Sequence, residues 1–168
     1  VKDTESSALK FVNADVENVE DALSGARDII AEWINENEYI RKRIRNLYVR
    51  TSEIKSRLIK GKEEEAEKYT DYFEYSGKLY KCPSHRLLAI RRGESEGFLK
   101  VKIEPEKKDA IAILEEKYIK SEGAVADQVR KAISDSYSRL LSSSIENEVA
   151  GISKEKADAE AINVFAKN

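Results

Sequence analysis

The chain has 168 residues, of which 40% are apolar and 37% charged, and its formal net charge is −2. This length suits one domain with a core or two small helical lobes, and the apolar fraction does not predict disorder. The single cysteine cannot form an internal disulfide and fits a reducing compartment. No apolar run is long enough to cross a membrane, and residues 1–10 lack the apolar centre of a signal peptide.

The near-neutral total hides an uneven distribution of charge. Nine cations and one anion fall between Arg41 and Lys62, and five cations and no anion between Lys78 and Arg92. The rest of the chain is strongly acidic. Such a dipolar sequence matters for partners, because a basic surface attracts anionic ligands even when the whole chain carries little charge.

The chain lacks methionine and ends in AINVFAKN without a helix stop signal. We therefore expect residues 1–168 to be a single helical module that forms part of a longer multidomain protein. Two helical sub-lobes, 1–61 and 105–168, would flank a mixed segment at 62–104.

The first predicted element is a helix that ends near residues 35–37. Its apolar residues recur at three- and four-residue intervals and form one stripe. The stripe contains Val12, Val16, Val19, Leu23, Ala26, Ile30, Trp33 and Ile34. Asn37 is the expected N-cap of a second helix.

That second helix turns Ile40, Ile44 and Leu47 inward. Its cations lie elsewhere on the surface: Arg41, Lys42 and Arg45 point away from the apolar stripe, with Arg43 and Arg50 on its flank.

The segment 62–75, KEEEAEKYTDYFEY, is typical of a short helix with acidic residues at its start. The aromatic residues around Ser76-Gly77 fit either a hairpin or an irregular loop. Pro83 suits the first turn of a further helix, which we expect to close near Gly93 or Gly97.

Residues 98–104, FLKVKIE, alternate apolar and charged side chains and predict a half-buried strand, with 53–59 as its partner. A helix should follow Pro105, and helical patterns continue through Leu141. Ser143 and Glu146 have the spacing of a capping box and predict the start of the last helix. The expected fold is mainly α, a multi-helix module with a small antiparallel β element around 53–59 and 98–104.

Cys82 and His85 bring the only cysteine and the only histidine together. A structural zinc site needs four ligands, so this pair cannot form one within the chain. A thiolate–imidazole pair would need an activated cysteine and a substrate cleft, and the sequence predicts neither. We expect a structural role for both residues, no catalytic residue and no metal site or other cofactor.

The basic windows are the strongest functional signal. Arg41, Lys42, Arg45, Arg91 and Arg92 are candidates for contact with nucleic-acid phosphates. The alternative is a solvated helix face, or ion pairing with the acidic remainder of the chain, and that alternative carries the greater weight.

Four stretches together resemble the Tex family of bacterial transcription accessory proteins. They are DALSGARDIIAEWI (21–34), KYTDYFEY (68–75), PSHRLLAIRRGESEGFLKVKI (83–103) and EKADAEAINVFAKN (155–168). The residues that match the family motif are Ser84, His85, Arg86, Gly93, Glu94 and Gly97. The resemblance spans essentially the whole chain and places it between the family's N-terminal helix-turn-helix part and its RNase-H-like domain.

The resemblance implies a cytoplasmic, multidomain protein that binds RNA or DNA, mainly through a C-terminal oligonucleotide-binding barrel outside these residues. It transfers no catalytic residue to this stretch, and it implies no membrane and no small-molecule substrate. It also suggests the transcription machinery as a partner of the full-length protein.

The six motif residues themselves have a structural interpretation. Ser84 can cap the helix that Pro83 opens, Arg86 or Arg91 can pair with Glu94, and Gly97 can adopt the positive φ that ends the turn.

The leading hypothesis is thus a non-enzymatic scaffold region. The alternative is a region that contacts RNA or DNA phosphates itself through basic helix faces. A weaker third hypothesis is an enzyme that uses Cys82 and His85.

Overall fold

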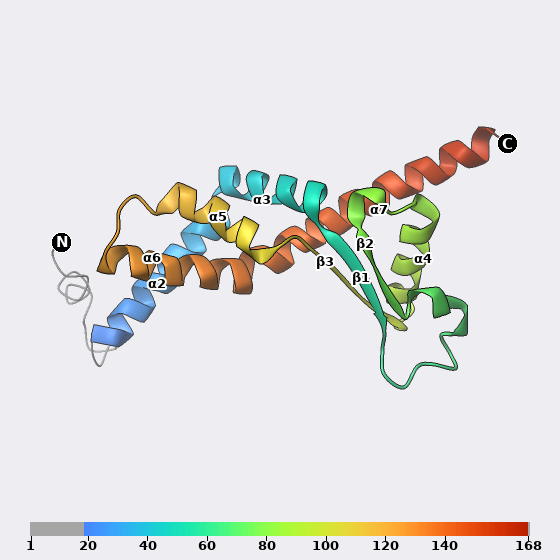
Figure 1. The fold of residues 1–168 in the computed structure, drawn as a ribbon, viewed down its shortest axis with the longest axis horizontal. Helices are drawn as coiled ribbons and strands as arrows, with labels where there is room; N and C mark the ends of the chain where they lie inside the picture. The colour runs from blue at the N-terminus through green and yellow to red at the C-terminus, as the bar shows by residue number, and fades with distance from the viewer. Residues whose placement is uncertain (1–18, 168) are drawn as a thin grey trace. The chain divides into compact units, whose positions relative to one another are not determined.

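A computed structural model of the chain describes residues 19–167. Within this range the fold is mainly α with one small antiparallel sheet, as the sequence predicted (Figure 1). The helices are α2 (Val19–Glu36), α3 (Glu38–Thr51), α4 (Ser84–Ser95), α5 (Lys107–Tyr118), α6 (Ala124–Asp135) and α7 (Ser142–Lys167). The strands are β1 (Glu53–Leu58), β2 (Glu74–Lys78) and β3 (Leu99–Glu104). Shorter elements are the 3-10 helices η1 (Glu67–Tyr72) and η2 (Leu79–Lys81), and the π-helix η3 (Ser136–Leu141).

The described residues form two compact units, and each unit combines two separate stretches of chain. The first unit contains residues 19–44 and 107–144, and the second contains residues 45–106 and 145–167. The division therefore falls inside α3 and inside α7. Each unit buries its own apolar residues: Ile34, Ile40, Ile44, Leu114, Ile133 and Leu141 in the first, and Tyr48, Ile54, Ile90, Leu99, Ile103 and Ile145 in the second.

In the first unit, α2 packs against α6, and α6 against α5 (Figure 1). The predicted cap between α2 and α3 is confirmed, because Asn37 Oδ1 accepts a hydrogen bond from the Ile40 backbone N–H at 3.0 Å. The prediction that Trp33 lies on the buried stripe is wrong: 66% of its surface is exposed. Val12 and Val16, predicted on the same stripe, lie outside the described residues.

The predicted helix start at Ser143 is also wrong. The backbone of Asp135, Ser136 and Ser142 stays in the right-handed α conformation, so the chain runs from α6 through η3 into α7 without a new N-terminus. In η3 the helix continues with i→i+5 hydrogen bonds, such as that from the Ser142 N–H to the Tyr137 carbonyl, where a break was expected. The π-helix is held in the first unit by Ser136, whose buried Oγ donates to the Ala31 carbonyl at 2.7 Å.

In the second unit, β1 is the central strand of the order β2-β1-β3, and both pairings are antiparallel. The predicted pairing of 53–59 with 98–104 is confirmed. The aromatic segment that the sequence left open contains β2. Helix α4 covers the face of the sheet that carries Ile54, Leu99 and Ile103 (Figure 1).

The start of α4 differs from the prediction. Pro83 itself is the N-cap residue, with φ −60° and ψ 146°, and no side chain caps the helix. Ser84 is not the cap, because its Oγ bonds to the carboxylate of Glu160. At the other end Gly97 has φ +83°, as predicted, whereas Gly93 lies within the helix.

Candidate nucleic-acid interface

Two of the outward cations of α3, Arg41 and Arg45, are engaged by groups of their own unit. In the first unit, Arg41 Nη1 donates to Asn35 O and Oδ1, both at 3.1 Å, and Arg41 Nη2 donates to Ser144 Oγ at 2.6 Å. In the second unit, Arg45 Nε lies 2.7 Å from Glu148 Oε2. Both arginines are half-buried. Their donors are therefore largely directed at the protein.

Two further cations of α3 differ from each other. Arg43 contacts Glu116 at 3.4 Å, and its guanidinium lies 5.9 Å from the centroid of the Tyr39 ring. Lys42 is exposed. Of the α3 candidates, Lys42 thus offers the more accessible charge.

The arginines of α4 are also divided. Arg91 Nη1 pairs with Glu94 Oε1 at 3.1 Å, as predicted, while Arg92 is exposed. Arg86 does not use Glu94: its guanidinium lies 5.3 Å from the centroid of the Tyr75 ring. A hydrogen bond with Tyr75 raises the pKa of Arg86 further above its ordinary value. The five candidate cations are distributed over both units and do not form one cluster within either.

Cys82 and His85 line different hollows of the second unit. Cys82 borders one with Leu79 and Ile152, and His85 borders another with Leu88 and Phe165. The His85 side chain is exposed. Burial raises the pKa of the Cys82 thiol, and this outweighs the opposing effects of a hydrogen bond from Tyr75 and the charge of Arg86. A protonated thiol is a poor nucleophile.

We expect iodoacetamide to alkylate Cys82 more slowly at pH 7 than it alkylates a cysteine in an unstructured peptide. The rate should still be rising at pH values above the ordinary thiol pKa, because only the thiolate reacts and the pKa of Cys82 is raised. Mass spectrometry measures this directly, since the chain has one cysteine. Rapid alkylation at pH 7 would contradict the protonated state.

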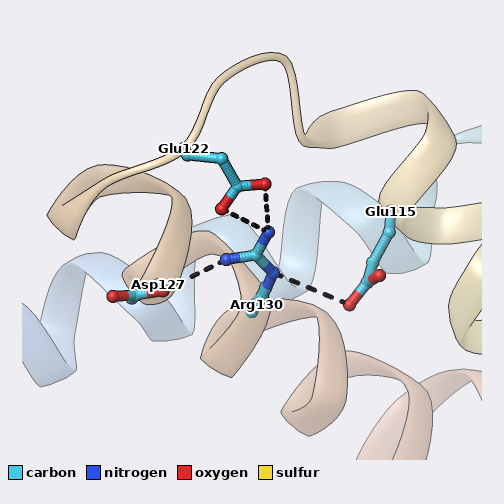
Figure 2. Close-up of polar contacts among 4 residues, drawn as sticks. All are labelled: Glu115, Glu122, Asp127 and Arg130. Carbon is cyan, nitrogen blue, oxygen red and sulfur yellow. Dashed lines mark hydrogen bonds and ion pairs between the residues drawn. The ribbon is translucent and has the colours of Figure 1, made fainter.

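Arg130, which the sequence did not single out, is the centre of an ion-pair cluster in the first unit (Figure 2). Its guanidinium contacts Glu122 at 3.0 Å and Asp127 at 3.1 Å, with Glu115 at 4.0 Å. The hydrogen bond with Glu122 is the main cause of its raised pKa. Arg130 thus connects α5, the following loop and α6. The i,i+3 spacing of Asp127 and Arg130 is the only sequence signal for this cluster.

A second cationic surface lies on the sheet, on the face opposite α4. Lys55 is directly opposite Lys102, and Arg57 directly opposite Lys100, across β1 and β3. All four residues are exposed. We call them the sheet-face cations. The alternation of 98–104 predicted that Lys100 and Lys102 face solvent, but only the register places them beside Lys55 and Arg57.

Two other features concern the described range as a whole. No group of three or more His, Cys, Asp or Glu side chains within residues 19–167 could hold a metal ion. None of the helices in this part of the chain is long and apolar enough to cross a membrane.

Comparison with known proteins gives a consistent result. A family model described as Tex central region-like matches residues 1–165. The chain is 40% identical over 151 residues to the uncharacterized protein YdcI of Bacillus subtilis, covering 89% of this chain and 21% of that protein. It is 34% identical over 176 residues to protein YhgF of Escherichia coli, with coverage of 98% and 23%.

A third relative carries a functional name. The chain is 31% identical over 173 residues to the transcriptional accessory protein Tex of Neisseria gonorrhoeae, covering 99% of this chain and 23% of that protein. The chain thus spans less than a quarter of the length of these relatives. Since the family model covers almost every residue, the chain belongs to the Tex family and corresponds to its central region.

Proposed function

We propose that this region is a non-enzymatic scaffold of a transcription accessory protein that binds RNA or DNA through other domains. A relative of this chain is named a transcriptional accessory protein, and this chain covers 23% of it, which leaves most of the relative's length for other domains. The full-length protein would act in the cytoplasm with nucleic acid and the transcription machinery as partners. It would need no cofactor in this region.

The observation that carries the proposal is the engagement of Arg41 and Arg45 of α3. Arg41 bonds to Asn35 and Ser144, and Arg45 to Glu148. Guanidinium groups that stabilise their own fold have fewer donors left for phosphate. The raised pKa of Cys82 argues against this residue as a nucleophile, because burial disfavours the thiolate that a nucleophilic cysteine needs.

The second candidate function is phosphate contact through basic helix faces. Lys42 and Arg92 favour it, because both are exposed. They belong to different units, however, and single cations contribute little to affinity for a polyanion. The scaffold therefore remains the better supported function of α3 and α4.

Two double variants test the two functions: their stability shows which cations hold the fold, and the salt dependence of binding shows which contact phosphate. We expect Arg41→Gln with Arg45→Gln to lower the free energy of unfolding by about 1–2 kcal/mol, because hydrogen bonds to carbonyl, hydroxyl and carboxylate partners are lost. Lys42→Gln with Arg92→Gln should leave stability within about 0.5 kcal/mol of the parent. Urea denaturation followed by circular dichroism measures both changes.

Oligonucleotide binding at several salt concentrations completes the test. In the scaffold function, neither pair of substitutions changes the salt dependence of binding. The helix-face function would be supported instead if Lys42→Gln with Arg92→Gln reduced the log–log salt slope by about 1.4, the value for two contacts to a single strand.

A further inference from the structure

The sheet-face cations are arranged in a way that opposes folding. Lys55 faces Lys102 and Arg57 faces Lys100 in directly paired positions of β1 and β3. Like charges directly opposite each other destabilise a sheet. Two such pairs in succession are therefore not explained by stability, and a ligand that neutralises them would offset their repulsion.

The four charges are only partly compensated by the protein. Lys102 pairs with Glu146 at 3.0 Å, and Lys55 lies 3.8 Å from Glu53. Arg57 and Lys100 make no ion pair among the described residues, although Glu74 is directly opposite Arg57 across β1 and β2. Among the four sheet-face cations, these two are therefore the exposed charges without an ion pair in the described part of the chain.

The surface over these cations is a hollow of about 670 Å³ bounded by all three strands. Its cations come from β1 and β3, while Ser76 and Glu74 of β2 form one border and Glu104 of β3 adds a second carboxylate. The backbone N–H and C=O groups between the strands beneath the hollow are already paired in the hydrogen bonds of the sheet. The hollow therefore recognises its occupant through charged side chains and offers no row of free backbone groups to a peptide strand.

This chemistry favours a polyelectrolyte over a protein. Protein interfaces depend on buried aromatic or apolar anchors, and the exposed side chains of this face are charged or hydroxylic. A nucleic-acid strand gains affinity from cations alone, because each neutralised phosphate releases condensed counterions. Alternate residues along a strand are about 6.6 Å apart, a spacing close to that of successive phosphates.

We propose that the exposed face of the β2-β1-β3 sheet binds the phosphate backbone of a nucleic-acid strand, with Arg57 and Lys100 as the principal contacts and Lys55 beside them. The contact does not read bases by stacking, since Tyr75, which borders the hollow, is directly opposite Ser56 and its ring lies beneath Arg86 of α4, on the other face of the sheet. This site goes beyond the proposed function, in which other domains bind nucleic acid.

The test measures binding of a fluorescein-labelled oligothymidylate of about 15 nucleotides to the 168-residue chain between about 20 and 200 mM salt. Arg57→Gln with Lys100→Gln should weaken binding at low salt by about tenfold or more and reduce the log–log salt slope by about 1.4. The matched control, Lys108→Gln with Lys131→Gln, removes the same charge from exposed positions of the first unit and should change neither value.

A stability measurement separates loss of binding from loss of fold. Because the substitutions remove the repulsion between Arg57 and Lys100 together with the attraction between Arg57 and Glu74, the Tm of Arg57→Gln with Lys100→Gln should stay close to that of the parent. Weaker binding together with an unchanged or raised Tm supports the site.

Four outcomes would overturn the inference. The first is unchanged binding after Arg57→Gln with Lys100→Gln, and the second is an equal loss in the control variant. The third is equal affinity for a poly-glutamate peptide of matched charge, which would identify an acidic protein as the partner. If the parent chain does not bind the oligonucleotide at low salt, the site is also refuted, while the scaffold function stands.

Discussion

Replacing Gly93 by alanine is expected to lower the free energy of unfolding by about 1–3 kcal/mol, although alanine is the better helix former. Gly93 lies inside α4, where a Cβ would be 2.5 Å from Leu99 Cδ1 and 2.9 Å from Leu99 Cγ. Tyr69 Cδ1 would follow at 3.3 Å. Leu99 is fully buried in the second unit and has little room to move. The helix and the strand would therefore have to separate.

Gly151→Ala is the matched control, because Gly151 also lies in a helix of the second unit. No atom comes within 4 Å of a Cβ at this position, and the residue is exposed. The substitution should raise the free energy of unfolding by about 0.5–1 kcal/mol through helix propensity alone. Urea denaturation measures both variants. A similar gain for Gly93→Ala would show that α4 and β3 are not closely packed at this point.

Glu146→Ala is expected to cost about 1–3 kcal/mol of unfolding free energy, because it leaves a buried backbone donor without a partner. β3 is an edge strand, and the Ile103 N–H on it donates to Glu146 Oε1 at 3.0 Å. The same carboxylate pairs with Lys102 Nζ at 3.0 Å, and only 17% of the Glu146 side chain is exposed. Glu146 thus blocks the edge of the sheet, which otherwise presents unpaired backbone groups.

The conservative variant identifies which of these contacts matters. Glu146→Gln keeps a carbonyl oxygen for the Ile103 N–H and removes only the ion pair with Lys102. It should therefore lower the free energy of unfolding by less than about 1 kcal/mol. Hydrogen exchange of the Ile103 amide should accelerate in Glu146→Ala and much less in Glu146→Gln. Equal exchange rates in the two variants would contradict the role of the carboxylate as the acceptor.

Local sequence patterns predicted those features whose causes are local. Asn37 caps α3 because its side chain reaches an amide three residues ahead, and Gly97 adopts positive φ because it lacks a Cβ. Arg91 and Glu94 meet because helical spacing brings them to one face. Alternation likewise predicted β3 as a half-buried strand. Only β3 needs a distant partner, since it forms by pairing with β1.

Patterns misled where a distant group competed for the same side chain. Ser84 binds Glu160 instead of capping its own helix, and Glu146 binds the edge of β3 instead of forming a capping box with Ser143. The apolar stripe correctly predicted the helix α2 but wrongly predicted that Trp33 is buried. A helical period identifies one face of a helix, but it does not determine how much of that face other elements cover.

The sequence by itself determined the helices, the pairing of 53–59 with 98–104 and the family resemblance, because each depends on periodicity or on motifs along the chain. Only the tertiary structure decided which charges remain available. It directs Arg41 and Arg45 toward internal partners, and its strand register gathers Lys55, Arg57, Lys100 and Lys102 on one face. The physical reason is that charge neutralisation acts over a few ångströms of space, between residues that the sequence separates by tens of positions.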